Sequence, residues 1–225
     1  MTEQFRCSYL PERKERLLVV HDDSCNYDVI YENLMAKGFR RSGDKVYTPF
    51  CPACSACESI RIPASEFKPS KSQRRIETKG QKHFHVTHTT MPEPGSYELY
   101  EKYINLRHKD GAMYPPDESQ FNSIAYCSWL KSIYINLWDG ETLVGVAITD
   151  MLPTALSAVY TFFDPDYQDL SPGTFAILAQ IKACSRYKRE HLYLGYQVDR
   201  CNKMNYKSKF VPHERLSDGE WVKYE

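Results

Sequence analysis

The sequence has no long apolar run, no net charge and no repeated or low-complexity tract. None of its apolar segments approaches the roughly 20 residues that a helix needs to cross a bilayer, so we expect no membrane partner. The first residues lead into no apolar signal segment, which predicts a protein of the cytoplasm rather than an exported one. What remains is the composition of an ordinary globular protein, with 42% hydrophobic and 26% charged residues in a chain of 225.

A balanced charge by itself predicts no nucleic-acid partner, because lysine plus arginine and aspartate plus glutamate number 29 each. The basic residues are nevertheless segregated. Between residues 68 and 82, six basic residues accompany one acid, and between 182 and 215, nine accompany three. A charged run is most often solvated surface. Two such stretches, the second interleaved with tyrosines, make phosphate binding an equal alternative.

Cysteine is the unusual part of the composition. Three of the eight cysteines lie at a spacing of two intervening residues, namely Cys51, Cys54 and Cys57. Two thiolates at that spacing can chelate one metal ion. A bacterial-type iron–sulfur run would need a fourth cysteine at position 61, where the chain has Arg61. A distant thiol such as Cys7 or Cys25 could complete a site, or the thiols could be structural. A disulfide framework is not expected in a reducing compartment.

The first half of the chain is predicted to mix short helices and strands. The expected elements are a helix at 28–37, a hairpin at 39–47, a strand at 59–63, a basic helix or loop at 70–80 and a strand at 83–88. The last of these would align three histidines on one face, and solvent exposure is favoured over a zinc site there. The Pro-Glu-Pro-Gly segment at 92–95 predicts a boundary between an N-terminal Cys-containing subdomain, 1–92, and a C-terminal domain, 93–225.

The second half predicts a recognisable order of elements. These are helices at 96–108 and 118–130, strands at 133–138, 142–149 and 155–163, a helix at 175–189, a strand at 191–198 and a short helix at 202–207. This order is that of the acetyltransferase-like (GNAT) fold, in which an acyl donor lies where two neighbouring strands separate. We therefore predict an α/β (α+β) protein with a GNAT-like acyltransferase core. A second GNAT-like fold is one alternative for the N-terminal subdomain.

An acetyl-CoA donor is disfavoured by the loop that would hold its phosphates. Users of acetyl-CoA with this fold carry an Arg/Gln-x-x-Gly-x-Gly/Ala loop at the start of the helix. The corresponding segment here, Leu-Ser-Pro-Gly-Thr at 170–174, has neither the second glycine nor the leading Arg or Gln. It could still present backbone N–H groups at a helix start.

Short blocks along the chain resemble the aminoacyl-tRNA–protein transferases, the arginyltransferase-like family. In the first half the blocks are Cys-Ser-Tyr-Leu at 7–10, Gly-Phe-Arg-Arg-Ser-Gly at 38–43, the cysteine run at 51–57 and Pro-Ser-Lys-Ser-Gln-Arg-Arg at 69–75. In the second half they lie at 103–113, 157–165, 193–196 and 203–207. The short chain is similar to the bacterial aspartate/glutamate leucyltransferase branch rather than to the longer eukaryotic arginyltransferases.

The resemblance implies transfer of leucine from leucyl-tRNA to proteins with an N-terminal Asp or Glu, which marks them for N-degron degradation. Gln197 and Pro172 depart from the residues expected beside the donor, so arginine transfer from arginyl-tRNA stays open. A metal-stabilised RNA-binding module without catalysis is the alternative from another class. The chemistry requires no cofactor, and a monomer is expected. The resemblance also implies a structural iron–sulfur cluster or zinc held by Cys7, Cys51, Cys54 and Cys57.

The transfer does not require a strong general base, because a protein α-amine has a pKa of about 8 and is partly neutral near pH 7. Positioning, oxyanion stabilisation and a proton for the leaving ribose oxygen remain to be supplied. Four residues on the strands predicted to separate are the catalytic candidates, namely Tyr160, Tyr193, Tyr196 and Gln197. The related leucyl/phenylalanyl transferases carry Asp-x-Gln on the last strand, and only Gln197 of that motif is present here.

Substrate binding requires cations for both partners. An acidic acceptor side chain suits the planar guanidinium of arginine, and our candidates are Arg74, Arg75 and Arg107. Lys203 and Lys207 are the candidates for the tRNA backbone. For each of these residues, the alternative interpretation is an exposed surface charge that binds neither substrate.

Overall fold

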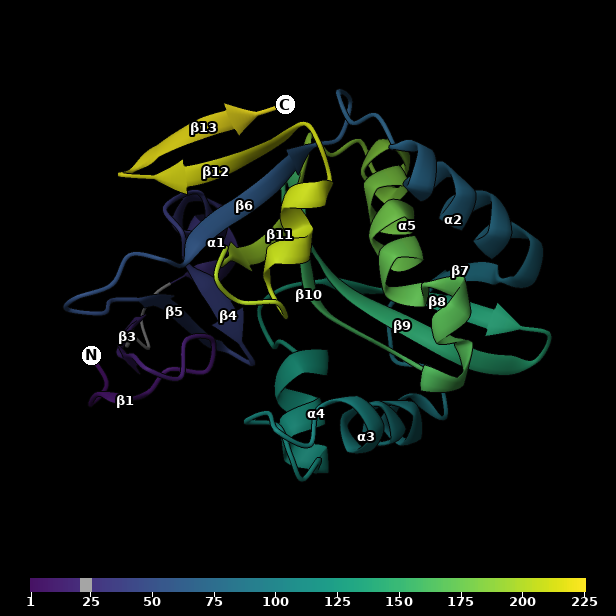
Figure 1. Cartoon of the computed structure of the whole chain (residues 1–225), viewed down its shortest axis with the longest axis horizontal. Helices are drawn as coiled ribbons and strands as arrows, with labels where there is room; N and C mark the ends of the chain where they lie inside the picture. The colour runs from purple at the N-terminus through teal and green to yellow at the C-terminus, as the bar shows by residue number, and fades with distance from the viewer. Residues whose placement is uncertain (21–25) are drawn as a thin grey trace.

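One large mixed sheet organises the chain, whose computed structural model describes residues 1–20 and 26–225 (Figure 1). Its eight strands run in the order β13-β12-β6-β11-β10-β9-β8-β7. Their bounds are β6 Glu58–Pro63, β7 His85–Thr89, β8 Ser132–Asp139, β9 Thr142–Met151, β10 Ala155–Phe163, β11 His191–Gln197, β12 His213–Ser217 and β13 Glu220–Tyr224. Neighbours pair antiparallel except β10 and β11, which are parallel.

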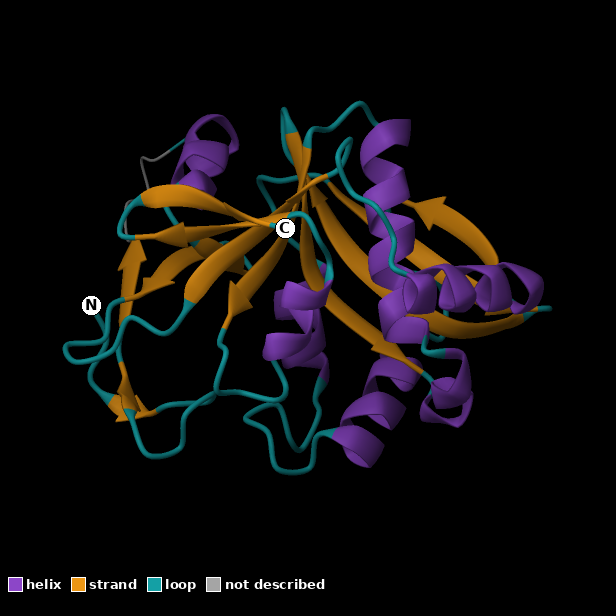
Figure 2. Ribbon diagram, turned by 45° about the horizontal axis from the view of Figure 1, so that its top comes forward, coloured by secondary structure: helices purple, strands orange, loops and turns teal. Residues whose placement is uncertain are grey.

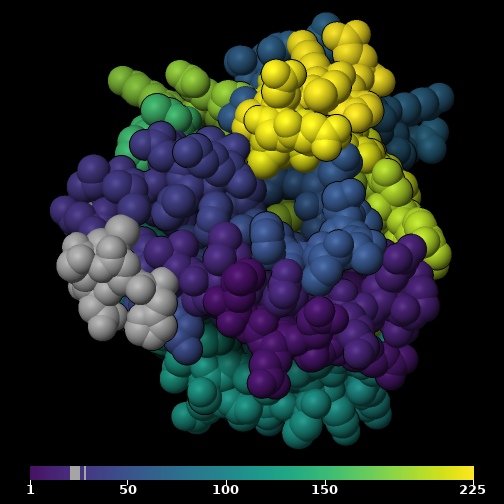
Figure 3. All heavy atoms as spheres, turned by 90° about the vertical axis from the view of Figure 1, so that its left-hand side faces the viewer, coloured from purple at the N-terminus to yellow at the C-terminus, as the bar shows by residue number. Residues whose placement is uncertain are grey.

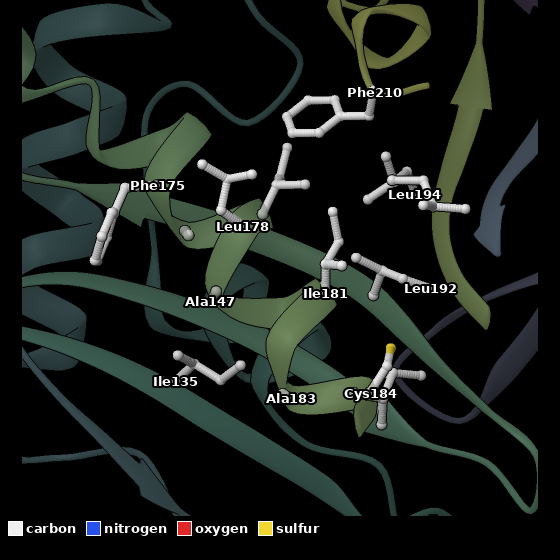
Figure 4. Packing of buried hydrophobic residues seen from close by; sticks show 14 of the residues in the cluster. Ile135, Ala147, Phe175, Leu178, Ile181, Ala183, Cys184, Leu192, Leu194 and Phe210 are labelled. Atoms are coloured by element: carbon white, nitrogen blue, oxygen red, sulfur yellow. The ribbon is translucent and has the colours of Figure 1, made fainter. Parts of the chain in front are cut away.

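Helices cover both faces of this sheet (Figure 2). Helix α5 (Pro172–Arg186) packs on one face, with α2 (Lys71–His83) beside it, and α3 (Ser96–Arg107) and α4 (Glu118–Ala125) pack on the other. The alternation of β8 explains this division. Ile133, Ile135 and Leu137 join the α5 cluster (Figure 4), whereas Tyr134 between them joins the α3–α4 cluster. Successive strand residues point to opposite faces, so a strand buried on both sides reads as continuously apolar.

A smaller sheet packs against the large one near its centre. It has the order β3-β5-β4, with β3 Leu17–Val20, β4 Arg40–Ser42 and β5 Lys45–Pro49, and helix α1 (Tyr27–Ala36) accompanies it. Tyr31, Met35 and Val46 from this unit form one cluster with Leu152, Ala155 and Tyr193 of the large sheet. The short pair β1 (Phe5–Arg6) and β2 (Lys14–Glu15) completes the N-terminal segment.

A buried ion pair joins the two sheets. Arg41 Nε and Nη2 donate to the two carboxylate oxygens of Asp150 on β9, each at 2.6 Å. The side chains are 1% and 0% exposed. Burial by itself disfavours the charged guanidinium, but the hydrogen bonds and charge of Asp150 outweigh it and raise the pKa of Arg41. The pair therefore stays ionised and fixes β4 on the large sheet.

Several predicted elements are found and two are corrected. The Asp139-Gly140 turn joins β8 to β9, with Gly140 at a φ of 57°. The predicted helix at 118–130 ends at Ala125, because the next residues turn towards the small sheet, where Ser128 N–H donates to Asp44 Oδ1 at 2.7 Å. The predicted three-histidine strand is wrong at its start. His83 closes α2, and His85 and His88, three positions apart on β7, point to opposite faces, so the three histidines do not share one face.

The large sheet also takes strands from both sides of residue 92. Strands β6 and β7 precede that position and β8–β13 follow it, so the proposed division at 92 stays a prediction about how the chain is organised. Two short 3₁₀ helices complete the fold, η1 (Pro165–Leu170) and η2 (Asn205–Lys209). Of the helices in the described residues, none combines the length and the apolar character needed to cross a membrane.

Candidate active site between strands β10 and β11

The two parallel strands separate after a short contact. Their pairing runs from Ala155 with His191 to Ser157 with Tyr193. Beyond this point β10 has an irregularity in its pairing with β9 between Ala158 and Tyr160. Irregularities of this kind bend a strand and interrupt its hydrogen bonds. Beyond Ser157 and Tyr193 the two strands are no longer paired, so the sheet opens between them.

Three tyrosines from different elements gather on the β10 side of this opening. They are Tyr160 on β10, Tyr103 on α3 and Tyr206 on η2. Burial raises the pKa of Tyr160, with smaller contributions from Tyr103 and Tyr206 among its neighbours. Burial likewise raises the pKa of Tyr206 to about 12. All three hydroxyls therefore stay protonated near neutral pH and can act as hydrogen-bond donors.

Gln197 ends β11 and is 1% exposed. Its Nε2 donates to Asp199 Oδ1 at 2.7 Å and to the Asn205 carbonyl at 3.4 Å. Its Oε1 is buried and has no partner within the described part of the chain. An unpaired buried acceptor costs free energy, so such an atom is a natural place for a substrate N–H group.

Asp199 holds Gln197 in this orientation. The hydrogen bond from Gln197 lowers the pKa of the Asp199 carboxyl, and Arg215 adds to the effect, donating at 3.0 Å and 3.2 Å. Sequence reasoning missed this residue because it looked for an acid two positions before the glutamine, whereas the chain has it two positions after. Tyr103 and Tyr206 were also missed as site residues, although both lie in blocks that carry the family resemblance.

Tyr193 and Tyr196, the other candidates on β11, point towards the small sheet. The Tyr196 hydroxyl donates to the Gly38 carbonyl at 2.8 Å, and the Tyr193 hydroxyl accepts from Arg61 Nη1 at 3.1 Å. The Arg40 guanidinium lies over both rings, 5.5 Å from Tyr193 and 5.3 Å from Tyr196. Both hydroxyls are thus engaged, that of Tyr196 with the segment before β4 and that of Tyr193 with β6, and a catalytic role for them stays a prediction.

The two candidate lysines have different surroundings. Lys203 Nζ is half-exposed and donates to Asp110 Oδ2 at 2.7 Å, which ties the loop before η2 to the loop after α3. Lys207 is buried, and its Nζ donates to the Tyr196 carbonyl at 2.6 Å. Its ammonium therefore supports the end of β11 and does not face solvent as Lys203 does.

Lys207 should make stability depend on pH. Burial, and to a smaller extent the charge of Arg40, lowers its pKa from 10.5 to about 7, while Cys201 and Cys57 oppose the shift. Between about pH 7 and 10.5 the unfolded chain binds a proton that the folded chain does not, so the free energy of unfolding should rise with pH in that window. Urea unfolding at several pH values would measure this rise. It should be absent in Lys207→Met, and an identical slope in both proteins would contradict the assignment.

The three candidate arginines lie on exposed helix surfaces. Arg74 and Arg75 are on the outer face of α2, where Arg74 Nη1 donates to the Pro69 carbonyl at 2.6 Å. Arg107 ends α3, donates to Gln168 Oε1 at 3.1 Å and lies 5.6 Å over the Phe163 ring at the end of β10. Arg107 is therefore on an element that flanks the opening, while Arg74 and Arg75 belong to a separate basic helix.

The four candidate cysteines come to one place. Burial is the main cause that raises the pKa of Cys57 to about 12, and the nearby thiols Cys7, Cys51 and Cys54 contribute to the rise. Cys7, Cys54 and Cys57 also pack with Val198 and Cys201, in the segment after β11, which sequence reasoning did not include. As the side chains are oriented within residues 1–20 and 26–225, no three of His, Cys, Asp or Glu form a ligand set for a metal ion. Cys25, the other candidate fourth thiol, lies outside the described residues.

The sheet order and the separating parallel strands define a GNAT-like acyltransferase core, which confirms the predicted fold class. Among solved structures, FemX is similar in fold, with a TM-score of 0.51 and 10% identity over 80% of this chain and 64% of that chain. At that identity the likeness concerns the fold alone.

Sequence comparison identifies the family. The models for the arginine-tRNA-protein transferase N terminus and C terminus match residues 5–75 and 95–217. Proteins named aspartate/glutamate leucyltransferase are similar over nearly the full length. The one from Pseudoalteromonas atlantica is 49% identical over 98% of this chain and 95% of its own, and the one from Aeromonas hydrophila is 48% identical over 98% and 92%. One from Vibrio cholerae is 46% identical over 98% and 94%. The chain belongs to the arginine-tRNA–protein transferase family, and the predicted resemblance is confirmed.

Proposed function

We propose that this protein transfers leucine from leucyl-tRNA to the N-terminal Asp or Glu of acceptor proteins. The observation that carries the proposal is identity of 46–49% with aspartate/glutamate leucyltransferases over 98% of the chain. The opening between β10 and β11 supports it, since a GNAT-like sheet holds its acyl donor at such a separation. The alternative donor, arginyl-tRNA, is not favoured by any of these relatives.

The chemistry exchanges an ester for an amide. The neutral α-amine of the acceptor attacks the carbonyl carbon of the leucyl ester, a C–N bond forms, and the C–O bond to the ribose breaks. The amine loses a proton and the ribose oxygen gains one, so the overall step needs no net acid or base. Holding amine and ester together can contribute about 7–11 kcal/mol towards the barrier.

We assign Gln197 and Tyr160 to this step. The free Oε1 of Gln197 is suited to accept an N–H of the attacking amine and so to orient its lone pair. The Tyr160 hydroxyl, whose raised pKa keeps it protonated, is suited to donate to the oxyanion or to the leaving oxygen. Asp199 and the Asn205 carbonyl hold the amide of Gln197 in place.

We assign the basic face of α2 to the tRNA backbone. Exposed cations lie along this helix, namely Lys71, Arg74, Arg75, Lys79 and Lys82. The single acid, Glu77, is occupied by Lys182 at 2.6 Å. A row of cations with so little compensating charge suits a phosphate backbone, whose binding is driven by counterion release. Of the three arginines considered for the acidic side chain of the acceptor, Arg107 lies nearest to the opening.

The decisive experiment offers the protein a mixed pool of labelled aminoacyl-tRNAs and peptides that start with Asp, Glu, Arg or Ala. Label from leucyl-tRNA alone, on Asp and Glu peptides alone, is the expected result. Transfer of arginine would redirect the proposal to the second donor. No transfer from any charged tRNA would refute the enzymatic function, and would favour a binding module instead.

We also propose that the products enter N-degron degradation in the cytoplasm and that the protein acts as a monomer. Support comes from the acidic acceptor specificity in the names of the relatives. Stabilisation by leucylation of a reporter that starts with Asp, rather than its loss, would contradict the degradative role. Size-exclusion chromatography with light scattering tests the monomer.

A structural metal at the N-terminal thiols is a separate proposal. The four thiols converge, and a cation among them would offset the repulsion between thiolates, which adds to the effect of burial on the pKa of Cys57. Protein purified without oxygen should then carry zinc or iron in elemental analysis, and Cys57→Ser should lose it. Metal-free protein with unchanged stability after chelation would contradict the proposal. The transfer chemistry itself involves only residues of the chain and the two substrates.

A further inference from the structure

A cavity of about 800 Å³ lies beside β11, on the side of the small sheet. Its walls come from four separate segments: residues 7–19, residues 37–58, Tyr196 and the β12–β13 turn at 216–219. Figure 3 shows this face, hollowed between the C-terminal hairpin and the N-terminal half of the chain. Pockets of about 300–1,000 Å³ are typical of ligand sites in proteins. The proposed function places neither leucyl-tRNA nor the acceptor protein in this cavity.

The rim of the cavity is cationic on two sides and carries an acid, Asp218, on the β12–β13 turn. Arg13 and Lys14 line it from the N-terminal segment, and Lys37 and Lys45 line it from the small sheet. All four side chains are exposed, and none has a carboxylate partner within 4.0 Å among the described residues. Cations without partners around a concave surface attract an anionic group.

The interior has a different character. Tyr9, Tyr47 and Tyr196 line it together with Glu15 and with the thiols proposed for the structural metal, Cys7, Cys51, Cys54 and Cys57. Glu15 is fixed by the Ser8 N–H, which donates to its Oε2 at 2.7 Å. Burial is the main reason that the pKa values of Tyr9 and Tyr47 are raised, and the Glu15 carboxylate adds to both rises, so it lies near these rings. Aromatic faces beside a carboxylate favour an ammonium group.

The cavity also reaches the reaction strand. Tyr196, one of its lining residues, directly precedes Gln197, and Glu58, another, pairs with Gln197 in the sheet. A ligand seated here would thus lie next to the strand that carries the proposed catalytic amide.

We infer that this cavity captures the acidic N-terminal residue of the acceptor protein, with its side-chain carboxylate towards the rim cations and its α-ammonium towards Glu15 and the tyrosines. The amine leaves this contact and loses its proton before it attacks beside Gln197. The inference rests on the proposed function and names the site of its second substrate. An N-terminal Asp or Glu carries both charges within a few bonds, as the cavity does. A neutral Asn or Gln would leave the rim cations without a partner. The preference for an N-terminal Asp or Glu over the corresponding amide therefore has a physical cause.

Two double variants test this, Lys37→Gln with Lys45→Gln and Arg13→Gln with Lys14→Gln. A fluorescent peptide that starts with Asp reports binding by anisotropy without tRNA, and transfer assays give KM for the peptide and for leucyl-tRNA. At least one pair should weaken peptide binding and raise the peptide KM by about tenfold, as loss of a charged hydrogen bond does. The KM for leucyl-tRNA should not change.

A matched variant, Lys68→Gln with Lys131→Gln, removes the same charge from exposed positions outside the cavity. It should bind the peptide as the unaltered protein does. Unchanged peptide binding in both cavity variants would overturn the inference, and so would a rise in the KM for leucyl-tRNA instead, because the cavity would then hold the tRNA end. If the unaltered protein binds Asp but not Asn peptides and the rim variants lose this preference, the cavity assignment stands even where no tRNA supports transfer.

Discussion

Replacing Arg41 with Met is expected to lower the free energy of unfolding by about 3–5 kcal/mol. The substitution removes one partner of a fully buried ion pair and leaves the Asp150 carboxylate uncompensated. Ser132 Oγ would still donate to Asp150 Oδ1 at 2.7 Å, but one hydroxyl cannot replace two guanidinium bonds. Urea unfolding followed by circular dichroism measures the loss.

The double variant Arg41→Met with Asp150→Leu separates the ion pair from the packing. Apolar side chains that replace both partners are often neutral for stability, so the double variant should recover most of the loss. Arg75→Met makes the same substitution on the exposed face of α2 and should cost less than about 0.5 kcal/mol. A loss below about 1 kcal/mol for Arg41→Met would mean that water reaches Asp150 and that the pair does not anchor the small sheet.

Local signals were sufficient for most helices and hairpins. Asp139-Gly140 between two apolar runs specifies a tight turn because both the spacing and the φ preference of glycine agree. Ser70 and Gln73 form a reciprocal capping box, which decides in favour of a helix where the sequence left helix or loop open. These features depend on residues close together in the chain.

Other features depend on residues far apart and could not be read locally. The α4 helix stops early because Asp44, more than 80 positions earlier, takes the Ser128 N–H. Strand β6 enters the sheet between β11 and β12, a pairing that no pattern within residues 58–63 specifies. The same limit applies to the site, since Tyr103, Tyr160 and Tyr206 become neighbours only through the fold.

The candidate catalytic residues show the same difference between what a local motif specifies and what only the fold specifies. Gln197 was identified from a motif, and its surroundings give it a defined task that the motif does not. Tyr193 and Tyr196 were chosen because they share its strand, but the interruption of the β6–β11 pairing between them and the Arg40 contact turn both rings towards the small sheet. A strand assignment fixes which residues are near a site, and side-chain direction at an irregularity must come from the structure.

Replacing Gln197 with Ala is expected to lower kcat for leucine transfer by about 100-fold or more, in the range seen when one preorganised polar group is removed from a reaction centre. The buried Oε1 that would orient the attacking amine is lost, while the bonds of Asp199 to Arg215 keep the surrounding loop in place. Single-turnover transfer from leucyl-tRNA to a peptide that starts with Asp measures the chemical step directly. KM values for both substrates should change little, because the group acts at the transition state.

Asp199→Ala distinguishes orientation from direct participation. It leaves the Gln197 amide present but removes the oxygen that fixes its Nε2, so we expect a smaller loss of about tenfold, with kcat again affected more than KM. Gln4→Ala makes the same change as Gln197→Ala at an exposed position and is the control for loss of a glutamine side chain. If Gln197→Ala retains kcat within about threefold, the amide does not orient the amine. Tyr160, the other side chain assigned to the transfer step, would then be the residue to replace, because its hydroxyl would have to serve the oxyanion and the leaving oxygen.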